Sequence, residues 1–127
     1  MGITLEDNVR IREFRPDDLA VVAALFRRVF RDGEKCNLAT LQSYLGDLFF
    51  EHPWRDPELT SRVSVTADGR VNGFIGVLQL RMNYRGMQVR AALASSLMVD
   101  NPQQDPMAGA RLLRSVLTGA QDLSLGE

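Results

Sequence analysis

The chain has few of the residues on which several classes of function depend. Among its 127 residues there is one cysteine, Cys36, one histidine, His52, and one lysine, Lys35. A single cysteine excludes an internal disulfide and gives no sign of an oxidising compartment. No apolar run approaches the ~18 residues needed to cross a bilayer, and residues 1–7 lack the pattern of a secretory signal. We therefore expect a cytoplasmic protein with no membrane partner.

The chain also has no large excess of positive or negative charge. The formal net charge is −1, and arginines are spread along the chain among acidic residues. Such a chain has no general field that attracts nucleic acid, so we expect no nucleic-acid partner. Histidine, cysteine and carboxylates do not occur together at ligand spacing, so we also expect no metal site. His52 precedes Pro53 at an expected helix end, where a capping or surface role is typical.

The hydrophobic residues recur along the chain with two spacings, one typical of helices and one typical of strands. A content of 45% hydrophobic and 24% charged residues is typical of one globular domain. Apolar residues at helical spacing predict helices over 19–30, from a cap at Asn37 to His52, and around 110–117. The face of the second helix would consist of Leu41, Tyr44, Leu45, Leu48 and Phe49. Alternation or long apolar segments predict strands at 9–14, 61–66, 71–83, 87–99 and 121–125.

The resulting order is β-α-α-β-β-β-α-β, which favours mixed α/β packing around one sheet. Turns are expected at Asp68–Gly69 and at Tyr84-Arg85-Gly86. The second of these turns joins two long strands, which should therefore be adjacent and antiparallel. Trp54 follows the second helix, where we expect it to fill the core rather than to form a binding surface.

Two segments carry a family resemblance. Ser96 to Asp100, followed by Asn101 to Leu113, resembles the apolar fourth strand, the Q/R-x-x-G-x-G/A loop and the helix of the GNAT acyl-CoA-dependent N-acyltransferases. Val9 to Asp18 has the form IRxxRPxD and looks like the first strand and turn of the same family. The resemblance implies a GNAT-like fold of one domain over 1–127, ending after the fifth strand and so incomplete at its C-terminus.

The resemblance also implies a cofactor site. The backbone of Leu97, Met98 and Val99 would bind the pantetheine arm of acetyl-CoA, while the side chains would be buried. Its pyrophosphate would lie at the start of the following helix, where free N–H groups and the helix dipole favour an anion. The residues at that position are Gln104, Met107, Ala108, Gly109 and Ala110. The acyl acceptor would be a small-molecule or peptide amine.

The loop departs from the family pattern in three places. Met107 replaces the middle glycine, Pro106 removes an N–H donor, and Asp105 adds a negative charge where phosphates would lie. A helix capped by Asp105, with Pro106 at its first position, accounts for the same segment. Both interpretations stay open.

No catalytic residue is predicted. The expected strand over 89–99 has no Asp, Glu or His, and Ser95 and Ser96 could hold a water molecule without acting as bases. Two functions therefore remain: an acetyl-CoA-dependent N-acyltransferase, or the cofactor-binding portion of one, and a catalytically silent GNAT-like structural or regulatory module. We expect a homodimer, with a fragment of a longer polypeptide as the alternative.

Overall fold

The computed structural model describes residues 10–30 and 37–126, and the elements follow the predicted order. Cys36 lies outside these residues. The elements are β1 (Arg10–Glu13), a short 3-10 helix η2 (Pro16–Asp18), α1 (Leu19–Phe30), α2 (Leu38–Phe50), β2 (Arg62–Val65), β3 (Val71–Tyr84), β4 (Met87–Val99), α3 (Ala108–Leu117) and β5 (Leu123–Gly126).

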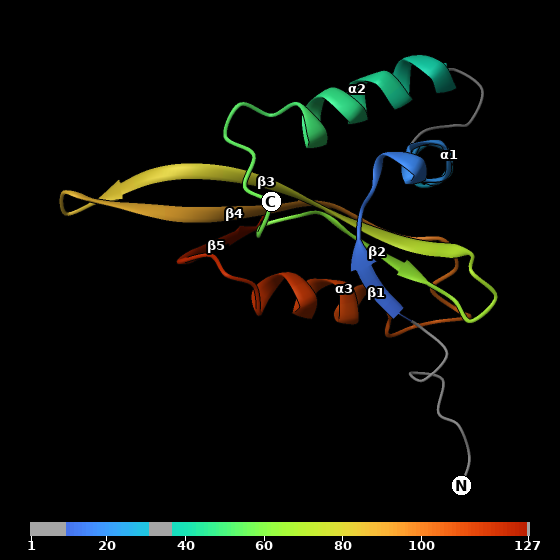
Figure 1. Ribbon diagram of the computed structural model, residues 1–127. Helices are drawn as coiled ribbons and strands as arrows, with labels where there is room; N and C mark the ends of the chain where they lie inside the picture. The colour runs from blue at the N-terminus through green and yellow to red at the C-terminus, as the bar shows by residue number, and fades with distance from the viewer. Residues whose placement is uncertain (1–9, 31–36, 127) are drawn as a thin grey trace, which may run out of the picture.

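One five-stranded sheet organises these elements, in the spatial order β1-β2-β3-β4-β5. Neighbouring strands are antiparallel except for β4 and β5, which are parallel. Helices α1 and α2 cover one face of the sheet and α3 covers the other (Figure 1). The mixed α+β fold and the antiparallel pairing of the two long strands are thus confirmed.

The β3–β4 connection is a two-residue turn. Arg85 and Gly86 both have positive φ, 52° and 80°, as a type I′ hairpin turn requires. The hairpin continues beyond the helices and forms a projecting arm (Figure 1).

Helix α2 begins where the sequence predicts. The Asn37 side chain accepts a hydrogen bond of 3.1 Å from the Thr40 N–H, which satisfies one of the unpaired donors of the first turn. Leu41, Leu45 and Phe49 are buried as expected, but Tyr44 is 56% exposed. Trp54 is 43% exposed, so the expectation that it fills the core was wrong.

The sheet is covered on both faces, which explains why β3 is apolar along most of its length. On the side of α1 and α2, the rings of Phe14, Phe49 and Phe74 meet edge to face at centroid distances of 5.0–6.2 Å. On the other side, Leu112 and Val116 of α3 belong to a buried cluster with residues of β3 and β4. In the described part of the chain, no helix is long and apolar enough to cross a membrane.

Candidate active site at the open edge of β4

Strand β4 contains an irregularity that the sequence did not reveal. Phe74 of β3 opposes Met98, whereas Gly76 opposes Ser95, so two residues of β4, Ser96 and Leu97, face Ile75 alone. This is a β-bulge, and Ser96 has a φ of 56°. A serine in the left-handed region is uncommon, and such residues concentrate at functional sites.

The bulge coincides with the point where β4 loses its parallel neighbour. β5 pairs with Ala91 to Ala94 only. From Ser95 to Val99, no described strand lies on that side of β4. Peptide groups along a strand alternate in direction, so some N–H and C=O groups of this segment point to the open edge. These are the backbone groups that a bound extended molecule could pair with.

The three predicted β4 site residues lie along this edge with different burial. Met98 is buried against the core under α1 and α2, as predicted. Leu97 is 42% exposed, so the expectation of a buried side chain was wrong there. The bulge is the reason: it turns Leu97 out of the regular alternation and toward the start of α3.

The start of α3 lies beside this segment. A methyl group added at Gly109 would come within 3.7 Å of Val99 and 3.8 Å of Leu97. The structure therefore brings together two groups of residues that the sequence predicted separately. The added methyl group would make only ordinary contacts, so Gly109 is not required for space.

The α3 N-terminus offers backbone donors. The helix begins at Ala108, with Met107 as N-cap and no side-chain cap. The Ala108 N–H is bonded to Asp105 O at 3.2 Å, whereas Gly109 and Ala110 are first-turn residues without an intrahelical acceptor. Ala108 itself is fully buried, and its role is to pack the helix on the sheet.

Gln104 and Met107 flank this helix start. Gln104 is exposed, and its N–H bonds back to Asn101 O at 3.1 Å, so its side chain and not its backbone is available. Met107 is 55% exposed at the N-cap position. As the N-cap, Met107 comes immediately before the first turn of the helix.

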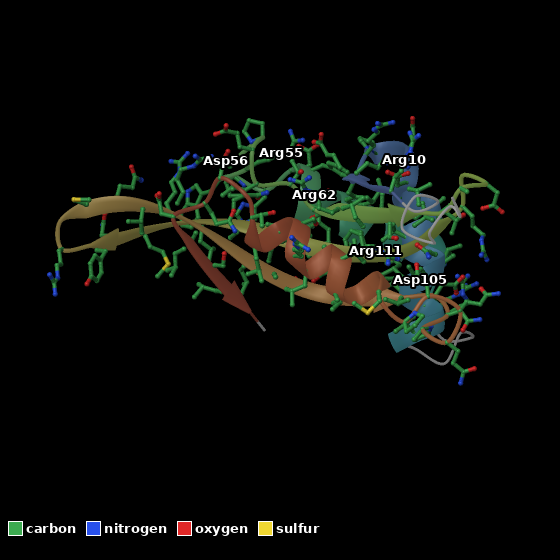
Figure 2. All side chains as sticks on the ribbon, turned by 90° about the horizontal axis from the view of Figure 1, so that it is seen from below. Arg10, Arg55, Asp56, Arg62, Asp105 and Arg111 are labelled. Atoms are coloured by element: carbon green, nitrogen blue, oxygen red, sulfur yellow. The ribbon has the colours of Figure 1, made fainter. Side chains whose placement is uncertain are left out.

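Asp105 is not the helix cap that the alternative interpretation expected. Its carboxylate accepts a hydrogen bond of 3.2 Å from the Asn72 side chain and forms an ion pair with Arg111. Figure 2 shows Asp105 at the start of α3 and Arg111 along the helix. The negative charge of Asp105 is therefore compensated by a cation, which reduces its expected effect on a nearby anion.

The position of Asn72 follows from a second irregularity. Ser64 of β2 opposes Gly73 and Val65 opposes Val71, so Asn72 has no counterpart on β2. This extra residue changes the alternation of β3 and directs the Asn72 amide to the α3 side of the sheet. No pattern within the sequence links Asn72 to Asp105, which is 33 residues away.

The acidic residue closest in sequence to the open edge is already engaged. Asp100 follows β4 and pairs with Arg28 at 2.9 Å and with Arg70 at 4.0 Å. Its N–H bonds to Asn72 O at 2.8 Å. Ser95 and Ser96 are the hydroxyl side chains on the open segment itself.

Comparison with known proteins identifies the fold of this chain. No family model matches the chain, and no curated protein matches it. Among solved structures, an acetyltransferase from Trypanosoma brucei has a TM-score of 0.68 at 13% identity, over 94% of this chain and 82% of that one. Glucosamine-6-phosphate N-acetyltransferase from Arabidopsis thaliana has a TM-score of 0.66 at 10% identity, over 94% and 81%.

A GNAT family acetyltransferase from Staphylococcus aureus aligns in the same way, with a TM-score of 0.67 at 12% identity, over 94% of this chain and 86% of that one. Identities this low establish shared architecture and leave the chemistry open. The chain therefore has the GNAT acetyltransferase fold, as the sequence resemblance implied.

Proposed function

We propose that the protein is an acetyl-CoA-dependent N-acyltransferase, transferring an acetyl group to an amine. The observation that carries the proposal is the bulge at Ser96, located where β4 parts from β5 and beside the N-terminus of α3. A strained, open strand edge beside a helix N-terminus suits a ligand that has an amide-containing arm and a phosphate group.

Two stretches of the chain have groups that suit acetyl-CoA. The open edge from Leu97 to Val99 has backbone groups for the amides of the pantetheine arm. The first turn of α3, at Gly109 and Ala110, has N–H donors for the pyrophosphate, with the exposed side chains of Gln104 and Met107 beside it. Acetyl-CoA supplies the activated thioester carbonyl that an amine attacks.

The residues of the protein would contribute to the reaction by positioning the reacting groups. An attacking amine must lose a proton, and no carboxylate or imidazole lies on β4 between Ala91 and Val99. We propose that the hydroxyls of Ser95 and Ser96 orient a water molecule that passes this proton to solvent, and that the departing thiolate takes up a proton from solvent. Backbone N–H groups at the bulge would orient the acyl carbonyl.

A second function is favoured by one specific feature. Asp105, Pro106 and Met107 leave fewer backbone donors and more bulk at the α3 N-terminus than a glycine-rich loop would. On that basis a catalytically silent GNAT-like module, with a structural or regulatory role, is the competing proposal.

One titration separates the two proposals. Calorimetry with acetyl-CoA, followed by thiol detection after adding a panel of small amines and peptides, measures binding and transfer in turn. An acyltransferase binds acetyl-CoA and releases free thiol only when an amine is present. Absence of binding at millimolar acetyl-CoA would reject the acyltransferase proposal. Binding without thiol release for every amine would favour the silent module.

A further inference from the structure

An open groove of about 600 Å³ lies at the opposite end of β4 from the bulge. Residues of β3 and β4 border it on one side, the loop over 54–59 on another, and Asp122, just before β5, on a third. Trp54, which the sequence placed in the core, lines this groove with its exposed indole. At ~3.3 Å per strand residue, Arg90 is about 20 Å from Ser96 along β4.

Arg90 fixes the walls of the groove. Its guanidinium bonds to Asp56 at 2.8 Å and to Glu58 at 2.8 Å, which holds the loop against β4. Its backbone N–H bonds to the Asp122 carboxylate at 2.9 Å, and its carbonyl accepts the Asp122 N–H at 2.9 Å. Burial alone would favour the neutral form of Asp56, but hydrogen bonds from Glu58 N–H and Arg90 lower its pKa. The groove is thus held in shape by charges that are already paired.

Two other cations, Arg55 and Arg81, line the groove. Within the described residues, neither Arg55 nor Arg81 has an acidic side chain at ion-pair distance. Arg55 lies over the Phe50 ring, with its guanidinium carbon 5.9 Å from the ring centroid. Figure 2 shows Arg55 next to Asp56 on the loop. Arg81 lies near enough to Asp56 to help lower the pKa of that carboxyl. Both guanidinium groups still have donors for a further anion, above all a carboxylate or phosphate.

A buried acceptor also lines the groove. Gln79 is 4% exposed, and its amide N–H donates to the Leu59 carbonyl. Its side-chain oxygen has no hydrogen-bond partner in the described structure. A buried acceptor without a donor is costly. A turn of the Gln79 side chain that brings this shielded oxygen to an N–H group of a ligand in the groove would therefore be favoured. Gln79 and Arg81 are two residues apart on β3 and share a face of the sheet.

We propose that this groove binds a small ligand that carries a carboxylate and an adjacent N–H group, as an α-amino acid or the C-terminal residue of a peptide does. The carboxylate bonds to Arg55 and Arg81, the N–H donates to the Gln79 side-chain oxygen, and an apolar side chain lies against Trp54. The proposal is independent of acetyl transfer, because it uses none of the residues of the open edge or of α3.

A ligand series with one group changed at a time tests the proposal. The full chain, labelled with ¹⁵N, is titrated with L-phenylalanine, N-acetyl-L-phenylalanine, 3-phenylpropionate, phenethylamine and inorganic phosphate, and the backbone and Gln79 side-chain amide signals are followed by NMR. We expect at least one of the two amino-acid probes to shift groove signals. 3-Phenylpropionate and phosphate should bind at least tenfold more weakly, and phenethylamine should cause no groove shift. The free and N-acetylated probes distinguish an amino acid from a peptide end.

Arg81→Gln should weaken binding at least tenfold, whereas Arg85→Gln, in the hairpin turn outside the groove, should leave it unchanged. The ligand series on the unaltered protein gives its answer even if a variant fails to fold. The proposal is overturned if neither amino-acid probe shifts groove signals, or if phosphate or 3-phenylpropionate binds as tightly as they do. It is equally overturned if Arg85→Gln weakens binding as much as Arg81→Gln.

Discussion

Arg12 and Asp18 form a two-point ion pair in which each of the two terminal guanidinium nitrogens lies 2.8 Å from a different carboxylate oxygen. The Arg15 N–H donates a third hydrogen bond to Asp18 at 2.9 Å. Both charged residues belong to the IRxxRPxD segment that resembles the family's first strand and turn. The structure gives that segment a physical role, because the pair ties β1 to the turn that starts α1.

The first prediction concerns the strength of this pair. The Asp18 side chain is 10% exposed, so Asp18→Asn should remove charge-assisted bonds from a largely desolvated site. We expect a loss of about 1.5–3 kcal/mol in the free energy of unfolding, measured with urea. Asp17→Asn, at the exposed neighbouring position, is the matched control and should change stability little. Equal effects of the two substitutions would contradict a specific role for the pair.

The second prediction concerns pH. The hydrogen bond from Arg12 lowers the pKa of Asp18, against a smaller opposing effect of burial. A carboxyl group whose pKa is lower when folded stabilises the protein above its unfolded pKa of about 3.9, and this stabilisation is lost as pH falls through the folded value. The stability gap between the unaltered protein and Asp18→Asn should therefore be full at neutral pH and shrink below about pH 4. Urea unfolding at a series of pH values measures the gap, and a gap independent of pH would argue against this assignment.

The elements were predictable from sequence because each depends on local periodicity or on one turn residue, as at Asn37 and Gly86. The bulge at Ser96 could not be predicted in this way. It is a property of the register between β3 and β4, and nothing in the amino-acid pattern of either strand marks it. The Asp105–Asn72 contact was missed for a similar reason: it depends on a second shift in register far away in sequence. Trp54 was misplaced because loop residues take their burial from the tertiary fold.

The third prediction tests strain at the bulge. Ser96 has a φ of 56°, a conformation that glycine adopts freely and β-branched residues resist. Ser96→Gly should leave stability nearly unchanged, whereas Ser96→Val should lower it by roughly 1–3 kcal/mol. Thermal and urea unfolding of the two variants measure the difference. If valine is tolerated as well as glycine, the left-handed conformation is not a fixed feature of β4.

The fourth prediction is that the protein forms a homodimer. The β3–β4 arm exposes Met82, Tyr84 and Met87, at 38%, 60% and 67%. Tyr84 opposes Met87, and Met82 opposes Val89, so these side chains share one uncharged face of the hairpin. Exposed apolar faces of this kind favour association, and a two-fold pair is the commonest arrangement for identical chains.

Sedimentation should therefore show dimers at micromolar concentrations, and Tyr84→Lys combined with Met87→Lys should shift the equilibrium toward monomer. Arg81→Lys on the opposite face of the arm keeps its charge and should not change the equilibrium. A stable monomer at high micromolar concentration, with no dye binding to exposed apolar surface, would refute the prediction.

The last prediction addresses the loop residue that departs most from the family pattern. Met107 is 55% exposed at the N-cap of α3, just before the first-turn residues Gly109 and Ala110. We expect acetyl-CoA binding to be weak and Met107→Gly to strengthen it roughly three- to tenfold, because glycine lets phosphates approach the backbone more closely. Glycine is also an acceptable N-cap, so the helix should persist. Met107→Leu keeps the bulk and serves as the control, with binding unchanged by calorimetry. Tight binding by the unaltered protein, or weaker binding by a folded Met107→Gly variant, would show that the side chain does not obstruct the site.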